Sequence, residues 1–90
     1  MFKILVVEDD AELQQLYCRV LSRNGYLPFG AAFAKEALDI MEHEYIDLII
    51  TDVMMPGMDG FEFVKTLRDG DCTLPVLVIT AKDSFRDKQI

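Results

Sequence analysis

Four apolar runs, separated by stretches of helical periodicity, constrain the fold of this chain more than any other feature. The runs occupy residues 4–7, 26–31, 46–51 and 75–80, and three of them are rich in β-branched side chains. Between the runs, apolar residues recur every three or four positions, which indicates amphipathic helices. This regular alternation predicts a parallel sheet with right-handed crossovers, so we expect an α/β fold.

The predicted helices are bounded by residues that favour helix ends. Asp10 and Asp59 can each accept a hydrogen bond from a free backbone N–H group, and so can cap the helices that follow them. These two helices are expected to end at about Asn24 and Asp69, and the helix between them near His43. We therefore assign Asp10 and Asp59 a structural role at helix ends.

Side-chain patterns within the elements predict which residues are buried. Pro28 lacks a backbone donor, which places the second strand at an edge of the sheet. In the third helix, the spacing of Phe61, Val64 and Leu67 predicts that these three side chains face the core.

Length and charge limit the classes of function. The 90 residues fit one domain, and the net charge of -7 argues against direct nucleic-acid contact, because that requires a basic surface. No apolar run approaches the roughly 18 residues of a membrane span, and two cysteines do not make a disulfide framework. The chain starts directly with a strand pattern, with no signal-peptide pattern before it, so we expect a cytoplasmic protein.

Acidic and hydroxyl side chains follow the predicted strands. Glu8 and Asp9 end the first strand, Asp52 ends the third and Thr80 ends the fourth. Parallel strands bring these ends to one edge of the sheet, and three carboxylates converge there if the first and third strands are neighbours, about 4.8 Å apart. Three carboxylates at close range repel one another, and a divalent cation with oxygen ligands such as Mg²⁺ removes that repulsion. The pattern therefore predicts an acidic Mg²⁺ pocket with room for a phosphoryl group.

Three stretches resemble the receiver domain of two-component response regulators. They read ILVVEDD at residues 4–10, DLIITDVMMPGMDGFE at 47–62 and PVLVITA at 75–81. The resemblance covers the whole chain, in order and with family-like spacing. It implies a flavodoxin-like doubly wound sheet with strand order 2-1-3-4-5.

The resemblance also implies roles for the residues at the sheet edge. Asp52 matches the aspartate that accepts a phosphoryl group from a sensor histidine kinase. Asp9 matches the acid that binds Mg²⁺ directly, and Glu8 the neighbouring acid that acts through water. Met54 matches the position whose backbone carbonyl binds the metal. The resemblance thus implies that this chain is a phospho-acceptor that assists its own phosphorylation and dephosphorylation, and that it is not an enzyme.

Further positions match the switch and the loop of the family. Thr80 matches the switch hydroxyl that turns toward the phosphoryl group, and Ala81 the small residue that leaves space for it. In the loop after Asp52, Gly57 and Gly60 are expected to relax backbone angles so that a carbonyl can turn toward the cation.

The family pattern continues beyond the last residues of this sequence. Ser84 is expected to cap a fourth helix, within which the sequence stops, and the family's fifth strand, last helix and phosphate-contacting lysine have no counterpart. We therefore expect residues 1–90 to form one incomplete receiver domain, with any output domain outside the chain. An exposed fourth strand is expected to favour a homodimer or a domain-swapped oligomer.

Two other functions stay open at this point. The chain could be a receiver that acts only as an interaction or dimerisation module, without phosphotransfer. An Mg²⁺-dependent phosphohydrolase on a similar sheet would need a second acid two residues after the nucleophile, where this chain has Met54.

Overall fold

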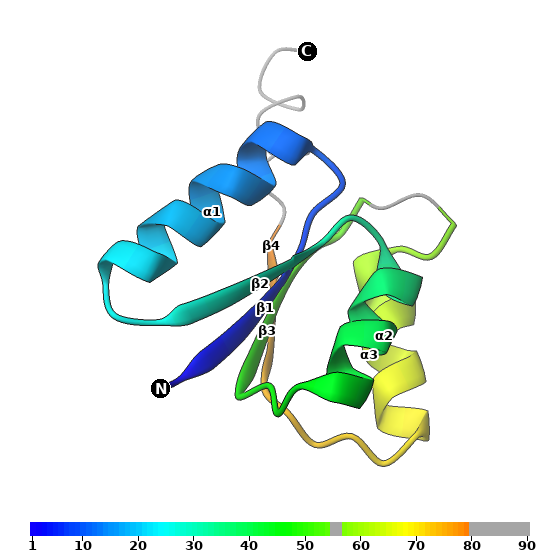
Figure 1. The fold of residues 1–90 in the computed structure, drawn as a ribbon. Helices are drawn as coiled ribbons and strands as arrows, with labels where there is room; N and C mark the ends of the chain where they lie inside the picture. The colour runs from blue at the N-terminus through cyan, green and yellow to red at the C-terminus, as the bar shows by residue number, and fades with distance from the viewer. Residues whose placement is uncertain (55–56, 80–90) are drawn as a thin grey trace, which may run out of the picture.

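A parallel α/β sheet with helices on both faces forms the molecule. The computed structural model describes residues 1–54 and 57–79. Its elements, drawn in Figure 1, are β1 (Lys3–Val7), α1 (Ala11–Arg23), β2 (Leu27–Ala31), α2 (Ala34–His43), β3 (Leu48–Asp52), α3 (Gly60–Asp69) and β4 (Val76–Ile79). The predicted fourth helix after Ser84 lies outside the described residues.

The strands are hydrogen-bonded in the order β2-β1-β3-β4, and every neighbouring pair is parallel. This confirms the flavodoxin-like order over the four described strands. Pro28 lies in β2 at one edge of the sheet, as predicted, and β4 forms the other described edge. The register pairs Val7 with Thr51, so β1 and β3 end side by side.

Two aspartates cap helices, as the sequence predicted. The Asp10 side chain accepts hydrogen bonds from the N–H groups of Glu12 and Leu13, at 3.0 and 3.2 Å. The Asp59 side chain accepts one from the Glu62 N–H at 2.8 Å. Each cap satisfies N–H groups that have no partner within the helix itself. The two caps therefore fix where α1 and α3 begin.

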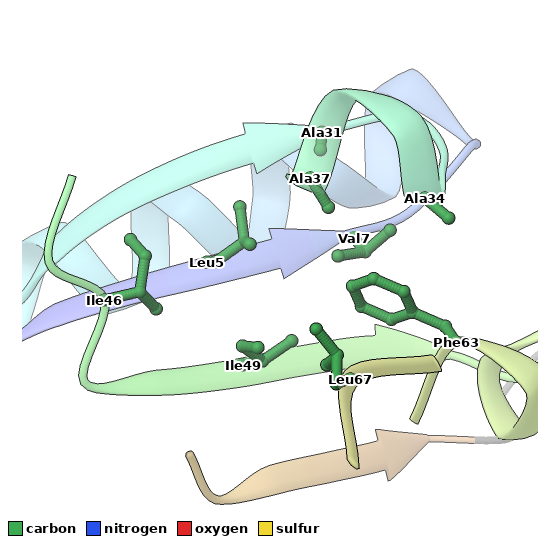
Figure 2. Packing of buried hydrophobic residues seen from close by; sticks show 9 residues of the cluster. All are labelled: Leu5, Val7, Ala31, Ala34, Ala37, Ile46, Ile49, Phe63 and Leu67. Atoms are coloured by element: carbon green, nitrogen blue, oxygen red, sulfur yellow. The ribbon is translucent and has the colours of Figure 1, made fainter. Parts of the chain in front are cut away.

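The hydrophobic core lies between the sheet and the pair α2 and α3, whereas α1 covers the opposite face (Figure 1). Figure 2 shows the buried side chains of this core, in which those of α3 point toward the central strands. The cluster consists of Leu5, Val7, Ala31, Ala34, Ala37, Ile46, Ile49, Phe63 and Leu67. Since β1 is flanked by strands and helices on all sides, Leu5, Val6 and Val7 are fully buried.

The prediction of which α3 side chains face the core is partly wrong. Leu67 is buried and Val64 is half-buried, but Phe61 is 63% exposed and Phe63 is fully buried instead. Phe63 and Leu67 are four residues apart and so lie above one another on one helix face. The helix face that carries Phe63 and Leu67 therefore packs on the sheet, and Phe61 lies on the solvent side.

The face of the sheet that α1 covers is less completely packed than the face that α2 and α3 cover. Within the described residues, none of the α1 side chains is fully buried. A groove of about 350 Å³ lies between α1, β3 and β4, and Leu77 of β4 is 54% exposed. Its lining is apolar: Leu16, Tyr17, Val20, Leu21, Ile50, Leu77 and Ile79.

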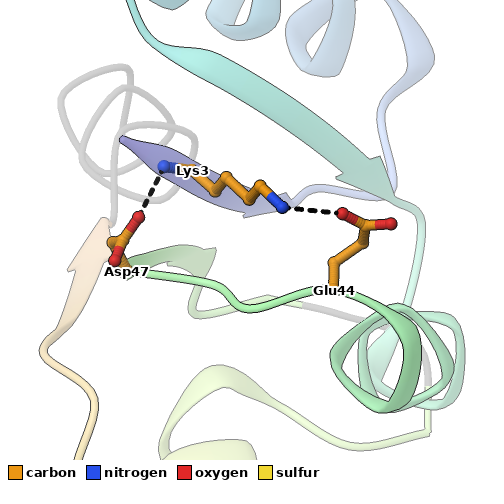
Figure 3. Close-up of polar contacts among 3 residues, drawn as sticks. All are labelled: Lys3, Glu44 and Asp47. Atoms are coloured by element: carbon orange, nitrogen blue, oxygen red, sulfur yellow. Dashed lines mark hydrogen bonds and ion pairs between the residues drawn. The ribbon is translucent and has the colours of Figure 1, made fainter. Parts of the chain in front are cut away.

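Lys3 joins the start of β1 to the segment between α2 and β3 (Figure 3). Its N–H donates to the Asp47 carboxylate at 2.8 Å, and its Nζ lies 3.0 Å from Glu44 Oε1. These contacts lie at the end of the sheet remote from the acidic residues, so they fix strand pairing and take no part in the site.

Among residues 1–54 and 57–79, the helices are too short or too polar for any of them to cross a bilayer. Neither cysteine forms a disulfide within the described residues. Burial raises the pKa of the Cys18 thiol, which keeps it protonated and weakly nucleophilic at neutral pH.

Candidate metal centre at the sheet edge

Three carboxylates meet where β1 and β3 end. Glu8 and Asp9 directly follow β1, and Asp52 is the last residue of β3. One carboxylate oxygen from each lies within 4.8 Å of the others. The parallel pairing of β1 with β3 produces this arrangement, because it aligns the carboxyl ends of two neighbouring strands. The sequence prediction that these acids converge is confirmed.

Glu8 is held by contacts to three different segments. Its side chain is almost fully buried, with 1% exposure, and its Oε2 accepts a hydrogen bond from the Asp10 N–H at 2.9 Å. Its own N–H donates to the Ala31 carbonyl of β2 at 2.9 Å, and its carbonyl accepts from Gln14 Nε2 at 3.0 Å. The backbone and the carboxylate of Glu8 are therefore both fixed.

Asp52 is held by the sheet. It is 2% exposed and pairs with Ile79 of β4, whose carbonyl accepts a hydrogen bond from the Val53 N–H at 3.1 Å. The buried Thr51 hydroxyl donates to the Asp52 carbonyl at 3.1 Å. Asp9, in contrast, is exposed. The cluster thus has two buried acids and one at the surface, so it is open to ions from solvent.

The donor set fits a hard divalent cation. Carboxylate oxygens are the ligands that Mg²⁺ prefers, and Mg²⁺ sites in proteins use one or two carboxylates and keep several waters. Three carboxylates that converge, two of them buried, carry a negative charge that a cation would offset.

The remaining predicted site residues are only partly described. Met54 is 47% exposed and lies two residues after Asp52. The metal-binding role of its carbonyl stays a prediction. Thr80 and Ala81 lie outside the described residues, so their predicted roles at the phosphoryl group also stay predictions.

The two glycines of the loop differ in their roles. Gly57 has a φ of 81°, a left-handed conformation that glycine adopts without steric cost. Gly60 instead permits a close approach, because a Cβ at this position would lie 2.5 Å from the Asp52 carbonyl oxygen. Its N–H also donates to the Val53 carbonyl at 2.8 Å. The start of α3 therefore rests on the backbone of the residues that end β3.

Substitution of Gly60 by alanine is expected to destabilise the protein by about 1–3 kcal/mol, because the added Cβ meets backbone that cannot move aside. Urea denaturation measures this difference. Gly70→Ala is the matched control, since a Cβ there meets only ordinary contacts at 3.6 Å, and its effect should stay within about 0.5 kcal/mol. Equal stability of the two variants would contradict the close approach.

Sequence reasoning missed two contributors to this site, Gln14 and Thr51. Gln14 lies on the amphipathic helix α1 and Thr51 in the apolar strand β3, and both donate to backbone carbonyls of the acidic residues. The only sequence signal for Gln14 was the glycine in β2, since a glycine within a strand often marks a close approach by another group.

Comparison with known proteins agrees with this geometry. The family model of the response regulator receiver domain matches residues 4–89. The heme response regulator HssR of Staphylococcus epidermidis is 38% identical over 89 residues, which are 99% of this chain and 39% of that protein. This chain therefore spans about two fifths of the length of that relative.

Solved structures share the fold. The receiver domain of the Francisella response regulator 1452 superposes with a TM-score of 0.85 at 34% identity, over 98% of this chain and 73% of that one. The MaeR response regulator bound to beryllium trifluoride gives a TM-score of 0.82 at 28% identity, over 90% and 68% of the two chains. The chain belongs to the response regulator receiver domain family, and its place is in two-component signalling.

Proposed function

We propose that Asp52 accepts a phosphoryl group from the phosphohistidine of a sensor histidine kinase. The observation that carries this proposal is the approach of the Glu8, Asp9 and Asp52 carboxylates within 4.8 Å of one another, at the carboxyl edge of a receiver sheet. Mg²⁺ would be held by these three carboxylates and by the Met54 backbone carbonyl. When bound, the cation supplies charge neutralisation for the phosphoryl oxygens.

Residues of this chain would position the reacting carboxylate. An oxygen of Asp52 attacks phosphorus, the phosphorus–nitrogen bond breaks, and the imidazole leaves with the bonding electrons and takes up a proton. Burial in β3 holds Asp52 in place for this attack. We assign the Thr80 hydroxyl to the bound phosphoryl group, and Ala81 to the space beside it.

Signal output would follow from a shift between two conformations of the domain. We propose that residues 1–90 form one receiver domain in the cytoplasm, which controls an output domain outside this chain. The relative HssR is longer than this chain, which supports a separate output domain. In this proposal the chain is a phospho-acceptor that assists its own phosphorylation and dephosphorylation, and it does not act on other substrates.

Mass spectrometry of the intact chain after incubation with acetyl phosphate tests the proposal. A gain of one phosphoryl group is expected with Mg²⁺, and none after chelation of the cation. The same measurement on a version extended to the length of the solved receiver domains separates a failure of the site from a need for later segments. Absence of labelling in both versions would refute the proposed function.

A second candidate function is self-association, which the apolar groove between α1, β3 and β4 favours. Leu77 lines this groove on the β4 edge and is 54% exposed, and a second copy could cover it through a homodimer or a swapped element. Static light scattering is expected to give the mass of a dimer at high concentration. Leu77→Lys should shift the equilibrium toward monomer. A monomer at all concentrations would count against this function.

A further inference from the structure

We propose that Gln14 is a positioning residue for the acidic cluster, and that Gly30 of β2 provides the space its side chain needs. The inference rests on the metal site of the proposed function. It concerns two residues, one on α1 and one on β2, that lie outside the cluster of three carboxylates.

Gln14 acts on the peptide unit that joins two of the acids. Its Nε2 donates to the Glu8 carbonyl at 3.0 Å. That carbonyl belongs to the same planar unit as the N–H of Asp9, so one hydrogen bond fixes the orientation of the backbone between the two residues. Because the side chains of Glu8 and Asp9 leave this unit from either end, Gln14 influences the direction of both carboxylates without contacting a metal.

Gly30 shows that the position of Gln14 is specific. A Cβ at Gly30 would overlap Gln14 Oε1 and would lie 2.8 Å from Gln14 Cδ. The amide group of Gln14 therefore lies directly over the backbone of β2, in the space that any other residue at this position would fill. Glycine costs stability inside a strand relative to alanine, so its presence here matches a requirement for space.

The same two elements hold the Glu8 backbone at both of its polar groups. Its N–H donates to the Ala31 carbonyl, one residue after Gly30, and its carbonyl accepts from Gln14. Together, β2 and α1 thus hold the start of the turn that carries the acids. Loss of the Gln14 contact is expected to widen the range of carboxylate directions and so to weaken cation binding.

The affinity for Mn²⁺, measured by the electron paramagnetic resonance signal of the free ion and by competition with Mg²⁺, tests this role without requiring phosphorylation. Gln14→Met keeps the length of the side chain and removes the donor, and it is expected to weaken binding about threefold to tenfold. Gln15→Met is the matched control, because Gln15 is the exposed neighbour on the same helix, and it should bind as the wild type does.

Gly30→Ala provides a second, independent variant. Its Cβ meets only the flexible end of Gln14, so the strand should keep its stability while the amide is displaced from the Glu8 carbonyl. Gly30→Ala should therefore weaken Mn²⁺ binding as Gln14→Met does, with a thermal unfolding midpoint at or above that of the wild type. The double variant should be no weaker than either single one, since both remove the same hydrogen bond.

The outcomes separate this inference from the proposed function. A wild-type chain that binds no Mn²⁺ would contradict the metal site itself, and the role of Gln14 with it. A wild type that binds Mn²⁺, together with unchanged affinity in Gln14→Met and Gly30→Ala, would overturn the positioning role and leave the metal site intact. Additive losses in the double variant would also overturn it.

Discussion

Replacement of Asp52 by asparagine is expected to abolish labelling by acetyl phosphate and binding of beryllofluoride in the presence of Mg²⁺. The amide has nearly the shape of the carboxylate, but it is a poor nucleophile and carries no charge to bind a cation. Asp52 is 2% exposed at the end of β3, so its carboxylate is held in place by the sheet. Mass spectrometry for the phosphoryl group and fluorine NMR for beryllofluoride measure the two losses.

The control for this experiment is a surface acid on another element. Asp39 is exposed on α2, and Asp39→Asn removes the same charge without touching the cluster. Its labelling should equal that of the wild type. Circular dichroism should show that both variants are folded. Labelling that persists in Asp52→Asn would mean that another residue accepts the phosphoryl group, and the assignment would be wrong.

Truncation of Phe63 to alanine is expected to have the largest effect on stability. Phe63 is fully buried in the cluster between α3 and the sheet (Figure 2), and loss of a buried aromatic ring costs about 3–5 kcal/mol. Small domains are stable by only about 5–15 kcal/mol, so much of the folded population should be lost at moderate temperature. Urea denaturation and the thermal midpoint measure the change.

Phe61→Ala is the matched control on the same helix. Phe61 is 63% exposed, so its truncation should change the free energy of unfolding by less than about 0.5 kcal/mol. The pair also tests the rotation of α3 directly. If Phe61→Ala were the more destabilising variant, the helix would present the face that the sequence pattern first indicated, with Phe61 toward the core.

The alternation of strands and helices and the acids at the strand ends could be predicted from the sequence, because both follow from strong local signals, whereas the strand order was implied by the resemblance to receiver domains. Continuous apolar runs mark strands that are covered on both faces, and Asp10 and Asp59 mark helix starts through their side-chain oxygens. Once the first and third strands are parallel neighbours, the meeting of Glu8, Asp9 and Asp52 follows from topology and needs no knowledge of side-chain contacts.

Other parts of the site could not be predicted, because they depend on distances between elements. Apolar spacing alone did not distinguish Phe61 from Phe63, since the rotation of α3 depends on how the helix packs on the sheet, where Phe63 and Leu67 are buried. The contact of Gln14 with Glu8 requires the separation between α1 and β2, which no local pattern encodes. From the sequence alone, a polar residue on an amphipathic helix is predicted to face solvent, and only the three-dimensional structure shows the groups that it contacts.

The burial of Ile4, Leu5, Val6 and Val7 in β1 has a consequence for local opening of the native state. Amide hydrogens of Leu5, Val6 and Val7, which have no exposed surface, should exchange with solvent only when the whole domain unfolds. Glu8 and Asp9 directly follow this segment, so their backbone is expected to stay folded as long as the strand does. Thermal fluctuations that open the less buried α1 face are expected to break the Gln14–Glu8 hydrogen bond while the strand that precedes the two acids stays in place.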